Sequence, residues 1–132
     1  MIIVDTNVLF AYTVEDHEHH ETARGIIENG EDLATTPEVF SEFAFLLWKY
    51  GVNNAEILEE YLRSPYFRIV YEPRAWLAAV LTLKDEKISL LRYNDTVLIH
   101  TARMLNAPVA SFDAQLIRHA KRLGARVIEH NI

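Results

Sequence analysis

Four acidic side chains stand in the sequence where solvent-exposed charges are not expected. Asp5 directly follows the apolar run "MIIV" and Asp113 follows "PVASF", so each carboxylate ends a β-prone segment. Glu42 lies within the apolar stretch "VFSEFAFLL", and Asp95 is followed at helical spacing by apolar residues, which predicts a core-facing helix surface. A carboxylate on such a surface is costly unless it is paired or binds a cation.

Each of these acids also has an ordinary structural explanation. Asp5 and Asp113 are suited to capping the helices that follow them. Asp95 is suited to a first helical turn, where the helix dipole favours an acid, and Glu42 to a buried ion pair or to the edge of the apolar stripe. A shared position of the four acids would favour a binding site over these structural explanations. The carboxyl ends of parallel strands meet at one edge of a sheet, where ligands bind. Carboxylates gathered there repel one another and need a cation, and oxygen ligands suit Mg²⁺ or Mn²⁺.

The elements that must position these acids alternate between strands and helices. Apolar runs predict strands over residues 1–5, 33–35, 66–71, 107–112 and 125–130. Periodicity and capping residues predict helices over residues 7–12, 19–28, 37–50, 53–63, 73–85, 92–105 and 113–123. This alternation is typical of an α/β fold, a three-layer α/β/α sandwich with a central parallel sheet. We expect one domain over residues 1–132.

The composition excludes several classes of function. Lys and Arg number 13 against 19 Asp and Glu, a net charge of −6, which argues against binding nucleic acid through a broad basic surface. To bind a phosphate-bearing substrate, the protein would need a local source of positive charge, such as a metal ion held by carboxylates. Because the chain has no cysteine, it has no disulfide, thiolate site or thiol nucleophile, which fits a cytoplasmic protein. The longest apolar-dominated run, residues 39–48, is too short to span a membrane.

Four segments, in the order "IIVDTNVL", "TTPEVFSEF", "YNDTVLIHTA" and "VASFDAQL", resemble the PIN-domain family of metal-dependent ribonucleases. The chain looks most like the VapC-type toxins of toxin–antitoxin pairs. The resemblance implies a catalytic and metal-binding quartet of Asp5, Glu42, Asp95 and Asp113. It also implies hydrogen-bonding support from Asn7 and Ser111.

The same resemblance implies a reaction and partners. The reaction would be hydrolysis of RNA phosphodiester bonds by water that Mg²⁺ or Mn²⁺ activates. An antitoxin protein would be the partner, and the toxin would be a homodimer. The number of ions stays open, as does the choice between Asp95 and Asp113 as the group that assists deprotonation of the water.

Two other clusters of polar residues have simpler interpretations. The histidines of "DHEHHE" lie in a polar stretch at a helix start, which favours a structural or solvated role over a zinc site; they are His17, His19 and His20. The basic residues of "RHAKRLGAR" favour a solvated helix face over a contact with phosphates; they are Arg118, Lys121, Arg122 and Arg126.

Three other functions remain as alternatives. A phosphatase with an aspartyl nucleophile after its first strand needs a second carboxylate two residues further on, where this chain has Asn7. A catalytically idle binding module of the same fold has no need for all four acids. A housekeeping RNA-processing nuclease of the family would lack an antitoxin gene next to its own.

Overall fold

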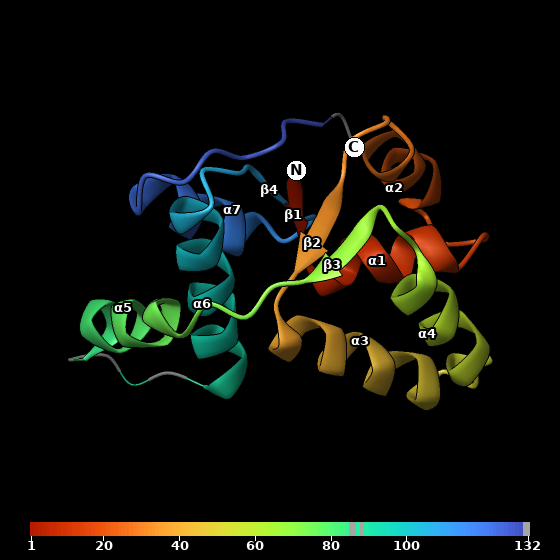
Figure 1. Ribbon diagram of the computed structural model, residues 1–132, viewed down its shortest axis with the longest axis horizontal. Coiled ribbons are helices and arrows are strands. Elements are labelled where there is room, and N and C mark those ends of the chain that lie inside the picture. Colours follow the sequence, from red (N-terminus) through yellow and green to blue (C-terminus); the bar gives the residue numbers. More distant parts are fainter. Residues whose placement is uncertain (85–86, 88, 131–132) are drawn as a thin grey trace.

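A computed structural model describes residues 1–84, 87 and 89–130 of the chain. Within these residues, four short strands and seven helices follow one another, with the strands in a single sheet (Figure 1). In chain order the elements are β1 (Ile2–Val4), α1 (Thr6–Thr13), α2 (His20–Ile27), β2 (Leu33–Thr35), α3 (Pro37–Lys49), α4 (Asn54–Arg63), β3 (Phe67–Ile69), α5 (Pro73–Leu83), α6 (Leu90–Met104), β4 (Val109–Ala110) and α7 (Ala114–Arg122).

All strands of the sheet are parallel, in the order β3-β2-β1-β4. The chain moves outward from β1 through β2 to β3, and then returns to place β4 on the other side of β1. The strand order therefore reverses between β1 and β4, and the crevice beyond the carboxyl ends of such strands is where ligands bind in open α/β sheets. Asp5 follows β1 and Asp113 lies just beyond β4, so both acids are at this crevice.

Helices cover the two faces of the sheet. Figure 1 shows α5, α6 and α7 on one side of it and α1, α2 and α4 on the other. All residues of β1, β2 and β4 are buried, as expected for strands covered on both faces. The main core joins these strands to the inward faces of α1, α3, α6 and α7, whereas Ala75, Ala79 and Val97 form a smaller cluster where α5 packs on α6. The three-layer α/β/α class predicted from the sequence is confirmed.

The predicted elements correspond to the observed ones with shifted ends, except at the C-terminal segment. Residues 125–130 do not form the predicted strand: Val127 makes one isolated bridge to Val109. β4 is only two residues long, and beyond it the His130 ring, rather than a backbone amide, lies 3.0 Å from the Ser111 carbonyl oxygen. Residues 125–130 therefore lie beside a strand, β4, that is too short to pair with them along their length. The predicted end of the helix at Asp85 lies outside the described residues.

In the described part of the chain, no helix is both long enough and apolar enough to cross a lipid bilayer.

Candidate functional site

Asp5 is both a helix cap and a buried acid. Only 6% of the residue is exposed. Its Oδ1 accepts a hydrogen bond from the Thr6 N–H at 2.8 Å, at the start of α1. Its Oδ2 accepts one from the Ser111 hydroxyl at 2.7 Å and one from the Asn7 side-chain amide at 3.2 Å. Capping therefore accounts for one carboxylate oxygen, while the other is held by two side chains that the sequence singled out.

Asn7 and Ser111 connect the two strand ends. The Asn7 Oδ1 accepts a hydrogen bond from the Phe112 N–H at 3.0 Å, and its Nδ2 lies 3.2 Å from the Ser111 Oγ. The Ser111 Oγ also accepts the Asp113 N–H at 3.0 Å. These bonds join the turn after β1 to the turn after β4, so the Asp5 carboxylate and the Asp113 backbone have a fixed relative position.

Asp113 caps α7 with one oxygen. Its Oδ1 accepts hydrogen bonds from the N–H groups of Gln115 at 2.9 Å and Leu116 at 3.4 Å. Within the described residues, its Oδ2 makes no hydrogen bond. The capping interpretation is thus correct for Asp113, and it leaves the second oxygen available to a ligand.

The other two acids come from helices α3 and α6. Glu42 is half-buried at the edge of the apolar stripe of α3, because Val39, Phe43 and Leu47 face the core while Phe45 is 56% exposed. Of the two structural explanations given for Glu42, the structure matches the edge of the apolar stripe. Helix α6 starts at Leu90 with Ser89 as its cap, which places the half-buried Asp95 beyond the first turn. A first-turn role for Asp95 is excluded.

All four acids line one pocket of about 320 Å³. Its other lining residues are Thr6, Asn7, Phe10, His17, Leu46, Tyr50 and Leu91. The pocket thus receives side chains from the ends of β1 and β4 and from α1, α3 and α6, which are distant in the sequence. The fold places the predicted quartet on a common surface.

Burial raises the pKa values of Asp5, Glu42 and Asp95, and repulsion by neighbouring carboxylates adds to the shift of Asp5 and Asp95. Burial raises the pKa of Asp5 to about 6, against the opposing effect of its hydrogen bonds and with the help of the charges of Glu42 and Asp113. Burial raises the pKa of Asp95 to about 7, and the charges of Asp5, Asp113 and Glu42 add to this increase. Burial also raises the pKa of Glu42, and the Thr6 side chain opposes the shift. The pocket therefore concentrates negative charge at a place poorly screened by water.

The chemistry of these donors fits a hard divalent cation. Four carboxylates supply oxygen ligands only, as Mg²⁺ and Mn²⁺ prefer. In the described part of the chain, no three Asp, Glu, His or Cys side chains are grouped closely enough to hold an ion between them. This spacing does not suit an ion enclosed by protein, but Mg²⁺ commonly binds through one or two carboxylates and retains several waters. The donor set therefore fits a hydrated ion.

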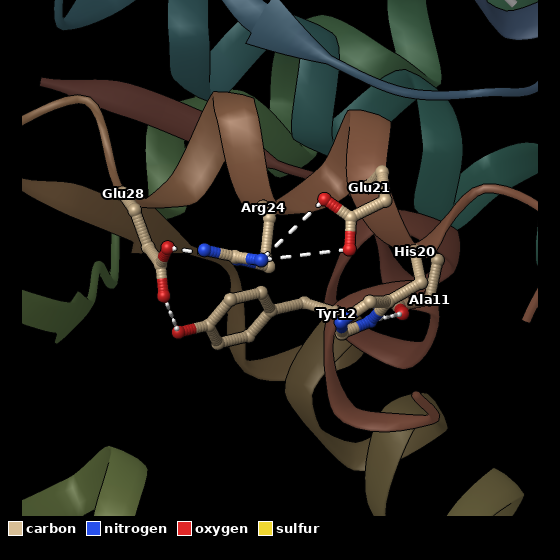
Figure 2. A network of polar contacts seen from close by, with 6 residues as sticks. All are labelled: Ala11, Tyr12, His20, Glu21, Arg24 and Glu28. Atoms are coloured by element: carbon tan, nitrogen blue, oxygen red, sulfur yellow. Dashed lines mark hydrogen bonds and ion pairs between the residues drawn. The ribbon is translucent and has the colours of Figure 1, made fainter. Parts of the chain in front are cut away.

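The three clustered histidines are less solvated than the sequence indicated. Each is partly buried, and His20 and His19 have structural contacts: the His20 Nδ1 lies 2.9 Å from the Ala11 carbonyl oxygen, and the His19 ring packs on Phe112. Figure 2 shows His20 beside Tyr12, whose hydroxyl donates to Glu28, so that α2 is fastened to α1. The structural interpretation is correct for these two, whereas His17 lines the acidic pocket.

The sequence did not single out the apolar and aromatic part of the pocket. Leu46 and Tyr50 follow Glu42 by four and eight positions, which is the spacing of one side of a helix, so this signal was present in α3. Phe10 offered no such signal. The basic cluster lies outside the pocket, and three of its members contact other groups: Lys121 pairs with Glu129, Arg122 contacts His119, and Arg126 donates to a backbone carbonyl.

The fold and the acidic crevice define a class of protein. Residues 2–122 match the family described as PIN domain, and the chain belongs to this family. No curated protein sequence matches the chain.

Several solved structures share the fold at low sequence identity. The toxin VapC20 of Mycobacterium tuberculosis, described as cleaving the sarcin–ricin loop, is 19% identical with a TM-score of 0.76, over 98% of this chain and 100% of its own. VapBC2 from Rickettsia felis, bound to a promoter DNA fragment, is 17% identical with a TM-score of 0.65, over 98% of each chain. FitAcB from Neisseria gonorrhoeae is also 17% identical with a TM-score of 0.65, over 98% of this chain and 97% of its own.

Proposed function

We propose that this chain, as a single PIN-like domain over residues 1–132, is a metal-dependent endoribonuclease of the VapC type. The observation that carries the proposal is the convergence of Asp5, Glu42, Asp95 and Asp113 on one pocket. Structural acids have no reason to gather from four separate elements, because their repulsion destabilises the fold. Membership of the PIN domain family supports the same conclusion.

In this proposal, the pocket holds a hydrated Mg²⁺ or Mn²⁺, with one or two of the four carboxylates as direct ligands and the others acting through bound water. The bound ion would lower the pKa of the attacking water and stabilise charge on the phosphodiester. Asn7 and Ser111 fix the orientation of the Asp5 carboxylate through its Oδ2. Asp95 and Asp113 are the two candidates for the group that assists deprotonation of the water, and within the described residues the Asp113 Oδ2 makes no hydrogen bond that would occupy it.

We also infer that the protein is the toxin of a toxin–antitoxin pair and a homodimer in the cytoplasm. The structural likeness to VapC20 and to the VapBC2 and FitAcB proteins supports the first inference. Exposed apolar side chains on α5 and at the start of α6 support the second; they are Leu77, Leu81, Leu90 and Leu91, of which Leu91 also lines the acidic pocket. A cognate antitoxin gene beside this one would distinguish a toxin from a housekeeping RNA-processing nuclease.

Cleavage of RNA with and without a chelator tests the proposal. Purified protein should cleave unstructured RNA in Mg²⁺ or Mn²⁺, and an excess of EDTA should abolish the cleavage, because the carboxylates alone cannot activate the water. Re-addition of Mn²⁺ should restore it. Cleavage that persists in EDTA with freshly purified protein would overturn the metal mechanism, and the absence of cleavage in either metal would favour an idle binding module.

A further inference from the structure

The acidic pocket has an aromatic wall that the catalytic proposal does not use. Three of its lining residues carry rings, namely Phe10, His17 and Tyr50, and we call this group the ring wall. The centroid of the Phe10 ring is 5.5 Å from that of Tyr50 and 6.0 Å from that of His17. The rings therefore form one contiguous surface beside the four carboxylates.

Further ring contacts hold His17, one member of the ring wall, in position. His17 contacts His19 at 5.7 Å between centroids, His19 packs on Phe112 at 4.8 Å, and Phe112 contacts His130 at 5.0 Å. Phe112 lies between Ser111 and Asp113, so this row of rings connects His17 to the turn that carries Asp113. The position of His17 relative to the quartet is thus set by packing, which is what a preorganised binding surface requires.

His17 offers one hydrogen-bond donor at the pocket. Its Nδ1 accepts the His19 N–H at 3.0 Å, so the neutral ring carries its proton on Nε2. Within the described residues, the Nε2 atom of His17 makes no hydrogen bond. An N–H group at the wall of a pocket can serve an acceptor on a ligand, such as the edge of a base or a phosphate oxygen.

Tyr50 is the exposed end of the ring wall. It is 61% exposed, and it ends α3 as the C-cap, where its ring contributes little to the core. The Lys49 ammonium lies 5.6 Å from the centre of the Tyr50 ring, so a positive charge stands next to the ring wall. The combination of an exposed ring and an adjacent cation suits an unstacked base together with its phosphate.

We propose that the ring wall binds one unpaired nucleobase of the RNA next to the bond that is cut. This inference rests on the proposed function for the identity of the ligand. Stacking supplies affinity without a basic surface, which a chain of net charge −6 lacks. A paired base inside a duplex presents only its edges, so its face cannot reach the rings.

Binding by variants of Tyr50 tests the ring wall separately from cleavage. The probe is a fluorescein-labelled single-stranded RNA of mixed sequence. Its anisotropy is measured in Mg²⁺ with the parent and every variant carrying Asp5→Asn, so that the ion offsets the charge of the pocket while cleavage is suppressed. Tyr50→Leu should weaken binding by roughly tenfold, because loss of one stacked base lowers affinity by about that factor or more. Tyr50→Phe, which keeps the ring, should bind within about twofold of the parent. Tyr66→Leu is the matched control, since Tyr66 is 67% exposed and does not line this pocket.

Photocrosslinking identifies the ring that contacts the base. RNA substituted with 5-iodouridine should crosslink to Tyr50, Phe10 or His17, and mass spectrometry of the digested protein locates the adduct. The same RNA annealed to its complement should give little adduct. Equal binding by Tyr50→Leu and Tyr50→Phe, or adducts confined to residues outside the ring wall, would overturn the inference.

The two proposals fail in different ways. If the protein cleaves RNA in Mn²⁺ but Tyr50→Leu changes neither binding nor crosslinking, the ring wall is wrong and the nuclease stands. If the protein binds RNA in a manner that depends on the Tyr50 ring but never cleaves it, the nuclease is wrong and the ring wall stands.

Discussion

Helix α6 carries two polar regions with opposite properties, the first half-buried and the second buried. One contains Asp95, which shares the acidic pocket with three other carboxylates. The other contains His100, which is 4% exposed: its Nε2 lies 2.9 Å from the Thr82 hydroxyl, and its Nδ1 lies 3.4 Å from an Arg103 nitrogen. Both regions shield polar groups from water. Only the His100 region gives each ring nitrogen a hydrogen-bond partner, whereas the Asp95 region brings like charges together.

The directions of the hydrogen bonds explain why the His100 region is stable. The Thr82 hydroxyl donates to the Ala78 carbonyl oxygen, so it accepts from His100 Nε2–H, and His100 Nδ1 is left to accept from Arg103. Burial and the charge of Arg103 lower the pKa of His100, which keeps the ring neutral. A similar arrangement joins α6 to α7 through Thr96 and His119 at 3.2 Å. Complementary neutral groups stabilise the fold, whereas the like charges of the pocket weaken it, which is typical of a binding site.

Loss of one carboxylate should give the largest effect and separate the two regions by function. Asp5→Asn and Asp95→Asn should each lower the rate of RNA cleavage in Mg²⁺ by at least about 100-fold, because each removes a negative ligand or proton acceptor. Initial rates with a fluorescent RNA check this expectation. Glu59→Gln, which alters an exposed acid on α4, should stay within about twofold of the parent. Similar cleavage rates for all three variants would show that Asp5 and Asp95 do not take part in the reaction.

Loss of His100 should affect stability instead of chemistry. His100→Ala should lower the free energy of unfolding by about 1–3 kcal/mol, since it removes a buried ring and its hydrogen bond to Thr82 from the contact between α5 and α6. Urea titration followed by circular dichroism measures this change. Cleavage per folded molecule should remain near that of the parent. A large loss of cleavage without a loss of stability would show that the two regions of α6 are not separable.

The sequence predicted the class of fold and the grouping of the acids because both depend on local patterns. Alternating strands and helices imply a parallel sheet, and its carboxyl edge collects Asp5 and Asp113 whatever the lengths of the strands. The position of His17 could not be predicted from the local pattern, since its place in the pocket depends on the contact of its ring with Phe10 and on the packing of α2 against α1. The burial of His100 is visible only once α5 packs on α6.

Metal binding should stabilise the parent more than a variant of the pocket. In the presence of Mn²⁺, the melting temperature of the parent should rise by several degrees relative to EDTA, because a ligand stabilises the state that binds it. The increase should be smaller for Asp95→Asn and unchanged for His100→Ala, whose pocket is intact. Thermal melts of the three proteins at one metal concentration provide the comparison. Equal increases for the parent and Asp95→Asn would show that Asp95 does not contribute to metal binding.

The smallest expected effect concerns the metal-free protein, in which the charge of Asp95 lowers the stability of the fold. Its pKa is about 7 in the folded protein against an ordinary 3.8, so between these values the folded state retains a proton that the unfolded state has lost. Stability therefore falls as the pH rises from about 4 to about 7, and the cost is complete above that range.

The comparison of the parent with Asp95→Asn isolates this cost from other titrating groups. His100 acts in the opposite direction, because its lowered pKa means that stability falls as the pH drops through the ordinary range of histidine, and this effect is present in both proteins. In EDTA at pH 8, Asp95→Asn should be more stable than the parent by about 1 kcal/mol, a modest value because Asp95 is partly open to solvent. At pH 4, where little of this destabilisation is present, the two should melt within about a degree of each other. A variant that is less stable than the parent at pH 8 would mean that the Asp95 carboxylate stabilises the fold, and the contrast with His100 would be lost.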